Sequence, residues 1–227
     1  METKKGRRSA ASPKNPSNNG AQKLNRFGQK FKIGVMGSAS GPFSRKQMLL
    51  ARRLGEAIAD HDLIMITGAC PGLPFEAAKA CQKKGGMVIG ISPAQSIEEH
   101  TQNYHSPLEH HDLIIYTGSG LMGREVINIR SCDMVLILGG KSGTLGEFAI
   151  AYDEGRLIGV LQHSGGISDH IDEIVHMVNK KTGSVLIYDA DPYQLVHRLV
   201  GKTHEMQSNG NTVMARFDGQ PLDTKGE

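Results

Sequence analysis

The sequence lacks the features that a secreted, membrane-spanning or disulfide-built protein needs. No stretch is long and apolar enough to span a membrane, and no apolar segment near Met1 resembles a secretory signal. The three cysteines, Cys70, Cys81 and Cys132, are an odd number without metal-type spacing. These absences predict a protein of the reducing cytoplasm, with no membrane partner and no metal or other cofactor.

Two common nucleotide-binding motifs are also absent. Where a Gly-x-Gly-x-x-Gly fingerprint would follow the first strand, the chain has Gly-Ser-Ala-Ser-Gly at residues 37–41. Gly140-Lys141-Ser142 looks like the end of a Walker A loop, but no glycine stands five residues before Gly140. These departures argue against an NAD-dependent dehydrogenase and a P-loop ATPase.

The positive charge of the chain is confined to its beginning. The 227 residues carry a net charge of +3, but residues 1–30 hold eight Lys or Arg against the single acid Glu2. That segment is therefore +7 and the remainder −4. Residues 1–29 are predicted to be a disordered basic tail, residues 30–201 one domain, and residues 202–227 a flexible C-terminal tail. An alternative function for the basic tail is a nucleic-acid-binding arm, although short basic tails are usually only solvated.

Apolar runs alternate with segments of helical periodicity along residues 30–201. This alternation predicts an α/β, Rossmann-like doubly wound sheet of about seven mostly parallel strands, with helices on both faces. The stretch 92–111 is too long for an ordinary connection and predicts a functional loop or lid, with exposed histidines at 100, 105, 110 and 111. The expected strands are residues 31–36, 63–67, 87–91, 113–116, 134–138, 157–161 and 185–188. The expected helices are about 44–59, 74–83, 121–130, 144–152, 168–179 and 192–200.

Four glycine-bearing loops follow predicted strands, at residues 37–41, 68–72, 118–123 and 139–143. The carboxyl ends of parallel strands lie at one edge of a sheet, so these loops are expected to converge there. Glycine lets a backbone approach a ligand closely, and the first turn of a helix attracts anions. The edge therefore predicts a small phosphorylated ligand. Hydroxyls such as those of Ser38 and Thr67 also commonly close turns. The candidate ligand residues are Gly37, Ser38, Thr67, Gly68, Gly139, Gly140, Lys141, Ser142, Gly143 and Thr144.

The segment Gly139-Gly140-Lys141-Ser142-Gly143-Thr144-Leu145-Gly146-Glu147 resembles the Gly-Gly-x-Gly-Thr-x-x-Glu signature of the Lonely Guy (LOG) family. Residues 122–133 are similar to the Arg-bearing segment of that family, and residues 67–73 to its second glycine loop. The family usually has lysine where Glu125 stands, and proline where Leu138 stands. Within the wider SLOG superfamily, the pattern resembles the branch related to molybdenum cofactor carriers and the DNA-processing protein DprA.

The resemblance implies a homodimer and places Arg124 and Glu147 on active-site residues of the family. LOG proteins are phosphoribohydrolases, which implies cleavage of the N-glycosidic bond of a nucleoside 5′-monophosphate. The related branch implies the alternative of a non-catalytic carrier of a phosphorylated pterin. The residues alone allow simpler interpretations, in which Thr144 and Glu147 form a helix capping box and Arg124 lies on the surface.

Overall fold

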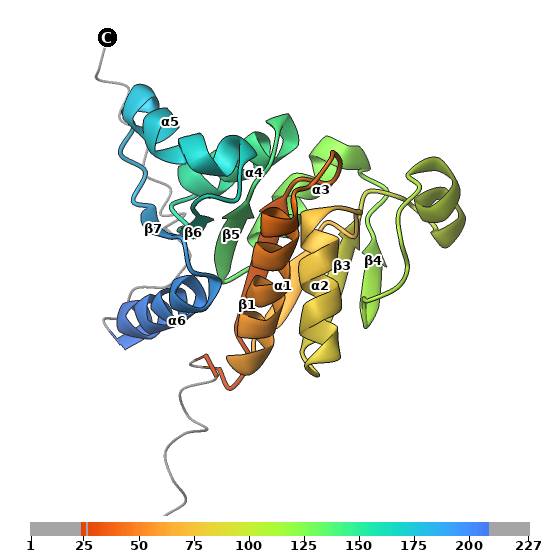
Figure 1. Cartoon of the computed structure of the whole chain (residues 1–227), viewed down its shortest axis with the longest axis horizontal. Helices are drawn as coiled ribbons and strands as arrows, with labels where there is room; N and C mark the ends of the chain where they lie inside the picture. Colours follow the sequence, from red (N-terminus) through yellow and green to blue (C-terminus); the bar gives the residue numbers. More distant parts are fainter. Residues whose placement is uncertain (1–23, 26, 209–227) are drawn as a thin grey trace, which may run out of the picture.

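The computed structural model describes residues 24–25 and 27–208, which form a seven-stranded, fully parallel sheet between two layers of helices (Figure 1). The predicted fold class is confirmed. The strands are β1 Lys32–Gly37, β2 Ile64–Thr67, β3 Met87–Ser92, β4 Leu113–Tyr116, β5 Met134–Leu138, β6 Leu157–Leu161 and β7 Val185–Asp189. No described helix is long and apolar enough to cross a membrane.

The order of the strands places a crevice at the centre of the sheet. From β1 the chain builds outward through β2, β3 and β4, and then returns to add β5, β6 and β7 on the other side of β1, which gives the order β4-β3-β2-β1-β5-β6-β7. The connections after β1 and β5 therefore leave the sheet in opposite directions. Ligands of doubly wound sheets bind at such a switch point, outside the carboxyl ends of the strands. At this edge Gly37 pairs with Leu138.

The two faces of the sheet are covered by different helices. One face carries α1 Arg45–Asp60, α2 Leu73–Lys83 and α6 Pro192–Ser208, and the other carries α3 Gly120–Arg130, α4 Ser142–Asp153 and α5 Ile171–Val178 (Figure 1). The π-helix η2 Glu99–Asn103 and the 3₁₀-helix η3 Gly166–His170 lie in the connections. Each helical layer buries its own apolar cluster against the sheet, as a doubly wound fold requires.

The last helix is longer than the sequence indicates. The expected helix ended near residue 200 and the expected flexible tail began at residue 202, but α6 continues to Ser208. Thr203 is fully buried and donates a hydrogen bond to the Leu199 carbonyl at 2.9 Å, and the His204 ring packs edge-on against Phe31. The prediction for residues 202–208 was therefore wrong. The predictions for residues 209–227 and for most of the basic tail (1–23 and 26) lie outside the described residues.

The long connection between β3 and β4 is packed onto the domain at His100. This side chain is fully buried, with Nδ1 2.8 Å from Ser92 Oγ and Nε2 3.1 Å from the Pro107 carbonyl oxygen. The expectation of exposed histidines is wrong at this position. The two hydrogen bonds replace those that the ring would make with water, so the ring can be buried. The described residues contain no cluster of His, Cys, Asp and Glu that could hold a metal ion.

Candidate functional site

A cavity of about 370 Å³ lies at the carboxyl edge of the central strands. Its walls come from the loops after β1, β2 and β5 and from the first turns of α3 and α4. All four predicted glycine loops therefore meet around one space, because Leu121 and Met122 of the fourth loop, where α3 begins, also line the cavity. Of the predicted residues, those that line the cavity are Gly37, Ser38, Gly68, Arg124, Lys141, Ser142, Gly143, Thr144 and Glu147.

The glycines after β5 shape this loop through hydrogen bonds within the protein. The Gly139 amide donates to Ser164 Oγ at 2.8 Å, and the Gly140 amide donates to Ser38 Oγ at 2.7 Å. Both glycines have positive φ, and a Cβ on Gly140 would overlap the Thr144 side chain. Their amides are therefore occupied, and the phosphate-binding role predicted for Gly139 and Gly140 does not fit this geometry.

The first turn of α4 offers the free donors instead. The helix begins at Ser142 after Lys141, and no side chain in the described part of the chain caps it. The amides of Ser142, Gly143 and Thr144 consequently have no partner within the helix. Thr144 lies inside the first turn, so the predicted capping box between Thr144 and Glu147 is absent. Three free amides, the positive end of the helix dipole and the exposed Lys141 form a site for an anion.

Glu147 is a buried carboxylate on the cavity wall. It is only 6% exposed, and burial raises its pKa to about 7. In this net value the Arg124 guanidinium opposes the effect of burial, the negative charge of Glu125 adds to it, and a hydrogen bond from Asn128 opposes it. With a pKa near neutrality, Glu147 can hold or release a proton at the pH of most cells.

Arg124 is buried beside this carboxylate, so the simpler interpretation, in which Arg124 lies on the surface, is wrong. It is 9% exposed, and no described residue accepts a hydrogen bond from its Nε or Nη1 atoms. The Nη2 atom lies 3.6 Å from Cys70 Sγ. The guanidinium lies so close to Gly68 that a Cβ there would overlap Nη1. A buried guanidinium with two unused donors is suited to binding an anionic ligand group.

Thr67 does not line the cavity. Its side chain is 1% exposed, and its hydroxyl accepts a hydrogen bond from the Ala69 amide at 3.1 Å and lies 3.1 Å from His111 Nε2. Thr67 therefore closes the turn after β2, which is the simpler of its two predicted roles. Cys70, in the same loop, has a pKa raised by burial, so the thiol stays protonated.

The sequence did not reveal the contribution of the inner face of α3. Asn128 is fully buried, donates a hydrogen bond to Met36 Sδ at 3.2 Å, and has no described partner for its Oδ1 atom. Glu125, Leu121 and Met122 line the cavity. Leu121 and Met122 precede Glu125 by four and three residues, and Asn128 follows it by three. This helical spacing places the four side chains on one side of α3, and it was the sequence signal that could have revealed them.

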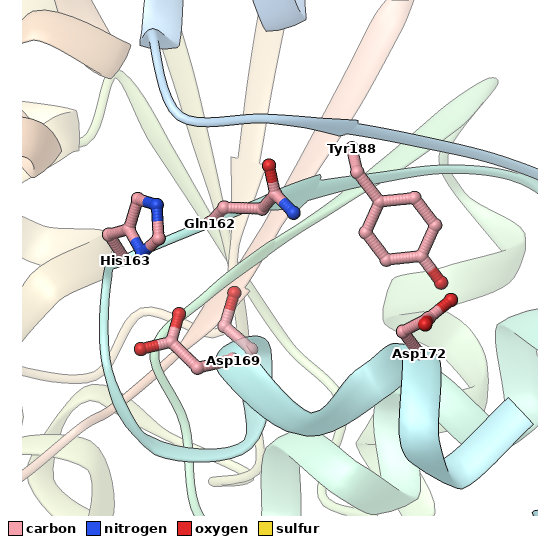
Figure 2. Close-up of a pocket in the computed structure, with 6 residues that line it drawn as sticks. Gln162, His163, Asp169, Asp172 and Tyr188 are labelled. Atoms are coloured by element: carbon pink, nitrogen blue, oxygen red, sulfur yellow. The ribbon is translucent and has the colours of Figure 1, made fainter.

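A second, smaller pocket of about 140 Å³ lies at the ends of β6 and β7. Figure 2 shows the Asp172 carboxylate and the Tyr188 hydroxyl pointing toward one another. The pKa of Tyr188 is raised to about 12, mainly by burial and next by the negative charge of Asp172. Because Asp169 and Asp172 make this pocket acidic, it does not fit a phosphorylated ligand, and the larger cavity is the candidate site.

The parallel sheet, its switch-point cavity and the glycine loops define a protein of the Rossmann-like ligand-binding class. The model of the SLOG cluster4 family matches residues 30–196, so the chain belongs to that family. This confirms the resemblance to the SLOG superfamily and identifies the chain as a ligand-binding SLOG protein.

Three proteins illustrate the similarity. An uncharacterized protein of Archaeoglobus fulgidus is 32% identical over 132 residues, which cover 58% of this chain and 80% of that protein. The molybdenum cofactor binding protein of Rippkaea orientalis is 26% identical with a TM-score of 0.63, over 78% of this chain and 98% of that one. The Moco carrier protein of Chlamydomonas reinhardtii is 26% identical with a TM-score of 0.62, over 77% and 99% of the respective chains.

Proposed function

We propose that the cavity binds a nucleoside 5′-monophosphate and that Arg124 and Glu147 hydrolyse its N-glycosidic bond. The observation that carries this proposal is the pair of buried, oppositely charged side chains at the cavity. Glu147 has a pKa of about 7, and Arg124 has two donors without acceptors. Such a pair is costly to bury unless it has a function.

The 5′-phosphate would bind at the start of α4. There the amides of Ser142, Gly143 and Thr144 are free of intrahelical bonds, and Lys141 adds a positive charge. Gly37, Ser38 and Gly68 form the facing walls, and a Cβ on Gly37 would overlap the Leu138 carbonyl. Arg124 would bind the remaining phosphate oxygens or orient the Glu147 carboxylate.

Glu147 would then act on the sugar. Breaking the bond between C1′ and the base nitrogen leaves positive charge on the ribose ring, which an ionised carboxylate stabilises. Water attacks C1′, the bond electrons leave with the base, and the proton lost by water balances the proton gained by the base. The products are the free base and ribose 5-phosphate. A carboxylate with a pKa near 7 can orient the water and accept its proton.

Product analysis tests the reaction. The full chain is incubated at pH 8 with the 5′-monophosphates of adenosine, guanosine, cytidine, uridine and inosine, and the products are separated by liquid chromatography with mass detection. We expect at least one free base together with an equal amount of ribose 5-phosphate. If no nucleotide is cleaved and the Glu147→Gln variant gives the same traces as the wild type, the hydrolase proposal fails.

The second candidate is a carrier of a phosphorylated pterin such as molybdenum cofactor. It is favoured by the 26% identity to the Rippkaea orientalis and Chlamydomonas reinhardtii proteins over nearly their whole lengths. A carrier needs the same phosphate site but no reaction at Glu147. Pterin fluorescence that co-purifies with the chain, combined with an inert nucleotide panel, would favour this candidate over the hydrolase.

Gly68→Ala tests the position of Arg124 without changing any charge. The three atoms nearest to the added Cβ all belong to the guanidinium at the flexible end of Arg124, so we expect the guanidinium to move and the fold to remain intact. We expect a loss of GMP affinity of about 10- to 100-fold, the value of one or two charge-assisted hydrogen bonds. Titration calorimetry measures the affinity, and the melting temperature reports on the fold.

The variants Arg124→Ala and Gly68→Ala/Arg124→Ala complete a double-mutant cycle. If Gly68 acts through Arg124, the double variant binds GMP no more weakly than Arg124→Ala alone. Additive losses would show that Gly68 acts independently of the guanidinium.

A further inference from the structure

Glu125 places a second buried carboxylate on the wall of the cavity. The residue is 5% exposed, and no hydrogen bond or salt bridge joins its carboxylate to any described residue. Burial raises the pKa of this carboxylate, and the positive charge of Arg124 opposes the rise. Its oxygens lie against glycines of α4, because Oε2 is 3.0 Å from the position of a Cβ on Gly146 and Oε1 is 3.7 Å from that on Gly143. Buried carboxylates are normally hydrogen-bonded, so a carboxylate on the cavity wall without a hydrogen bond to the protein indicates a donor on a ligand.

Apolar side chains lie beside this carboxylate on the same helix. Leu121 and Met122 precede Glu125 by one turn of α3, line the same cavity, and are 53% and 72% exposed. Residues three and four apart share a helix face. A flat ring lying against Leu121 and Met122 would bury their apolar surface while presenting its polar edge to Glu125.

The two oxygens of a carboxylate match a ring edge with two adjacent N–H donors. The 2-amino-4-oxopyrimidine edge provides them, as the ring N–H and the 2-amino group of guanine or of a pterin. Adenine instead places a ring acceptor beside its amino group, and this acceptor would face a carboxylate oxygen without a proton between them. The carboxylate therefore favours the 2-amino-4-oxopyrimidine edge over the edge of adenine. An unpaired buried polar group costs more binding free energy than a paired one contributes.

We infer that Glu125, Leu121 and Met122 form a subsite for a ring with a 2-amino-4-oxopyrimidine edge. The inference rests on the proposed function, since it assigns the ring end of a ligand whose phosphate lies at the start of α4. Guanine nucleotides and phosphorylated pterins share this edge. The subsite therefore fits the ligands of both candidate functions and separates them from adenine and pyrimidine nucleotides.

Binding of four ligands to the full chain tests the subsite. GMP, IMP, AMP and neopterin monophosphate are titrated by calorimetry at pH 8, above the pKa of Glu147, and at 5 °C, where turnover is slow. We expect GMP or neopterin monophosphate to bind at least about tenfold more tightly than AMP, the value of one charge-assisted hydrogen bond. IMP, which lacks the 2-amino group, should bind between GMP and AMP. Tighter binding of GMP identifies a guanine site, and tighter binding of neopterin monophosphate a pterin site.

Glu125→Gln separates ring recognition from a structural role. Glutamine keeps the shape but replaces one acceptor by a donor, so the affinity for GMP or neopterin monophosphate should fall about tenfold while that for AMP changes less than about twofold. Glu173→Gln, on the exposed surface of α5, is the matched control and should leave the affinities for all the ligands unchanged.

Three different results would contradict the subsite, and each has a different meaning. Equal losses for GMP and AMP in Glu125→Gln would show a structural role and overturn the subsite. Equal affinities of AMP, GMP and neopterin monophosphate for the wild type would overturn it even if the variant failed to fold, and would leave the proposed function standing. If none of the four ligands binds, the subsite is overturned, and the proposed function fails as well if the product analysis shows no cleavage of the cytidine and uridine nucleotides.

Discussion

The Glu147→Gln variant is expected to lose at least about a hundredfold in the rate of N-glycosidic cleavage while still binding the nucleotide. Glutamine keeps the size of the side chain but cannot carry the negative charge that stabilises the ribosyl cation. Since Arg124 and the start of α4 are unchanged, the affinity for GMP should stay within a few-fold of the wild type. Initial rates and calorimetric titrations at pH 8 measure the two quantities separately.

The pH dependence should report the same carboxylate. Burial raises the pKa of Glu147 to about 7, and the ionised form is the active one. The wild-type rate should therefore rise between pH 6 and pH 8 with a midpoint near 7, and fall about tenfold per unit at lower pH. A rate that is flat across this range would show that Glu147 does not act as the ionised group.

The contribution of Glu147 to the free energy of unfolding should fall as the pH rises, whereas the reaction rate rises. The pKa of Glu147 is about 7 in the folded state against 4.5 for an unperturbed side chain, so the folded protein holds the extra proton between these values. The contribution of this group to stability is thus largest at low pH and declines as pH rises from about 4.5 to 7, by about 3 kcal/mol. Glu147→Gln lacks this decline, so its free energy of unfolding relative to the wild type should increase through that window. Urea denaturation at pH 5 and pH 8 measures the change.

Gly55→Ala is expected to be the most destabilising small substitution in the described helices. A Cβ at this position would overlap the backbone carbonyl of Ala77 and lie 2.8 Å from its carbonyl carbon and 2.9 Å from the Cys81 amide nitrogen. Because these are backbone atoms, α1 and α2 must separate, which costs about 3 kcal/mol or more. The melting temperature should fall by roughly 6–12 °C.

Gly201→Ala is the matched control for that experiment. Gly201 lies within α6, and among the described residues no atom beyond its chain neighbours and its own helix backbone lies within 4 Å of a Cβ added there. Alanine is the better helix former, so this variant should gain about 0.5–1 kcal/mol. If Gly55→Ala melts at the wild-type temperature, the close contact of α1 with α2 does not control stability.

Local sequence patterns were sufficient for the sheet and for the position of the site. Short buried runs such as residues 134–138 have strand composition, and the glycines that follow them belong at the carboxyl edge of a parallel sheet. The expectation that the glycine loops meet around one space follows from topology alone, and the cavity confirms it for all four.

The predictions that were wrong concern features that depend on contacts between residues distant in the sequence. The amide of Gly139 is occupied by Ser164, 25 residues later, and that of Gly140 by Ser38, 102 residues earlier. No local pattern reveals that these hydroxyls reach the loop. The burial of His100 and the extension of α6 past residue 202 likewise depend on tertiary partners. Helix propensity and spacing are weak guides where tertiary packing decides the outcome.

The most direct test of a phosphate-binding cavity is native mass spectrometry of the full chain, recorded immediately after mixing with the five nucleoside monophosphates and neopterin monophosphate. We predict a one-to-one complex with at least one of these ligands on the wild type. The same complex should be absent or strongly depleted on Arg124→Ala, whose melting temperature first shows that it is folded. A wild-type spectrum without any complex, or equal complexes on both proteins, would contradict a site in which Arg124 binds a phosphorylated ligand.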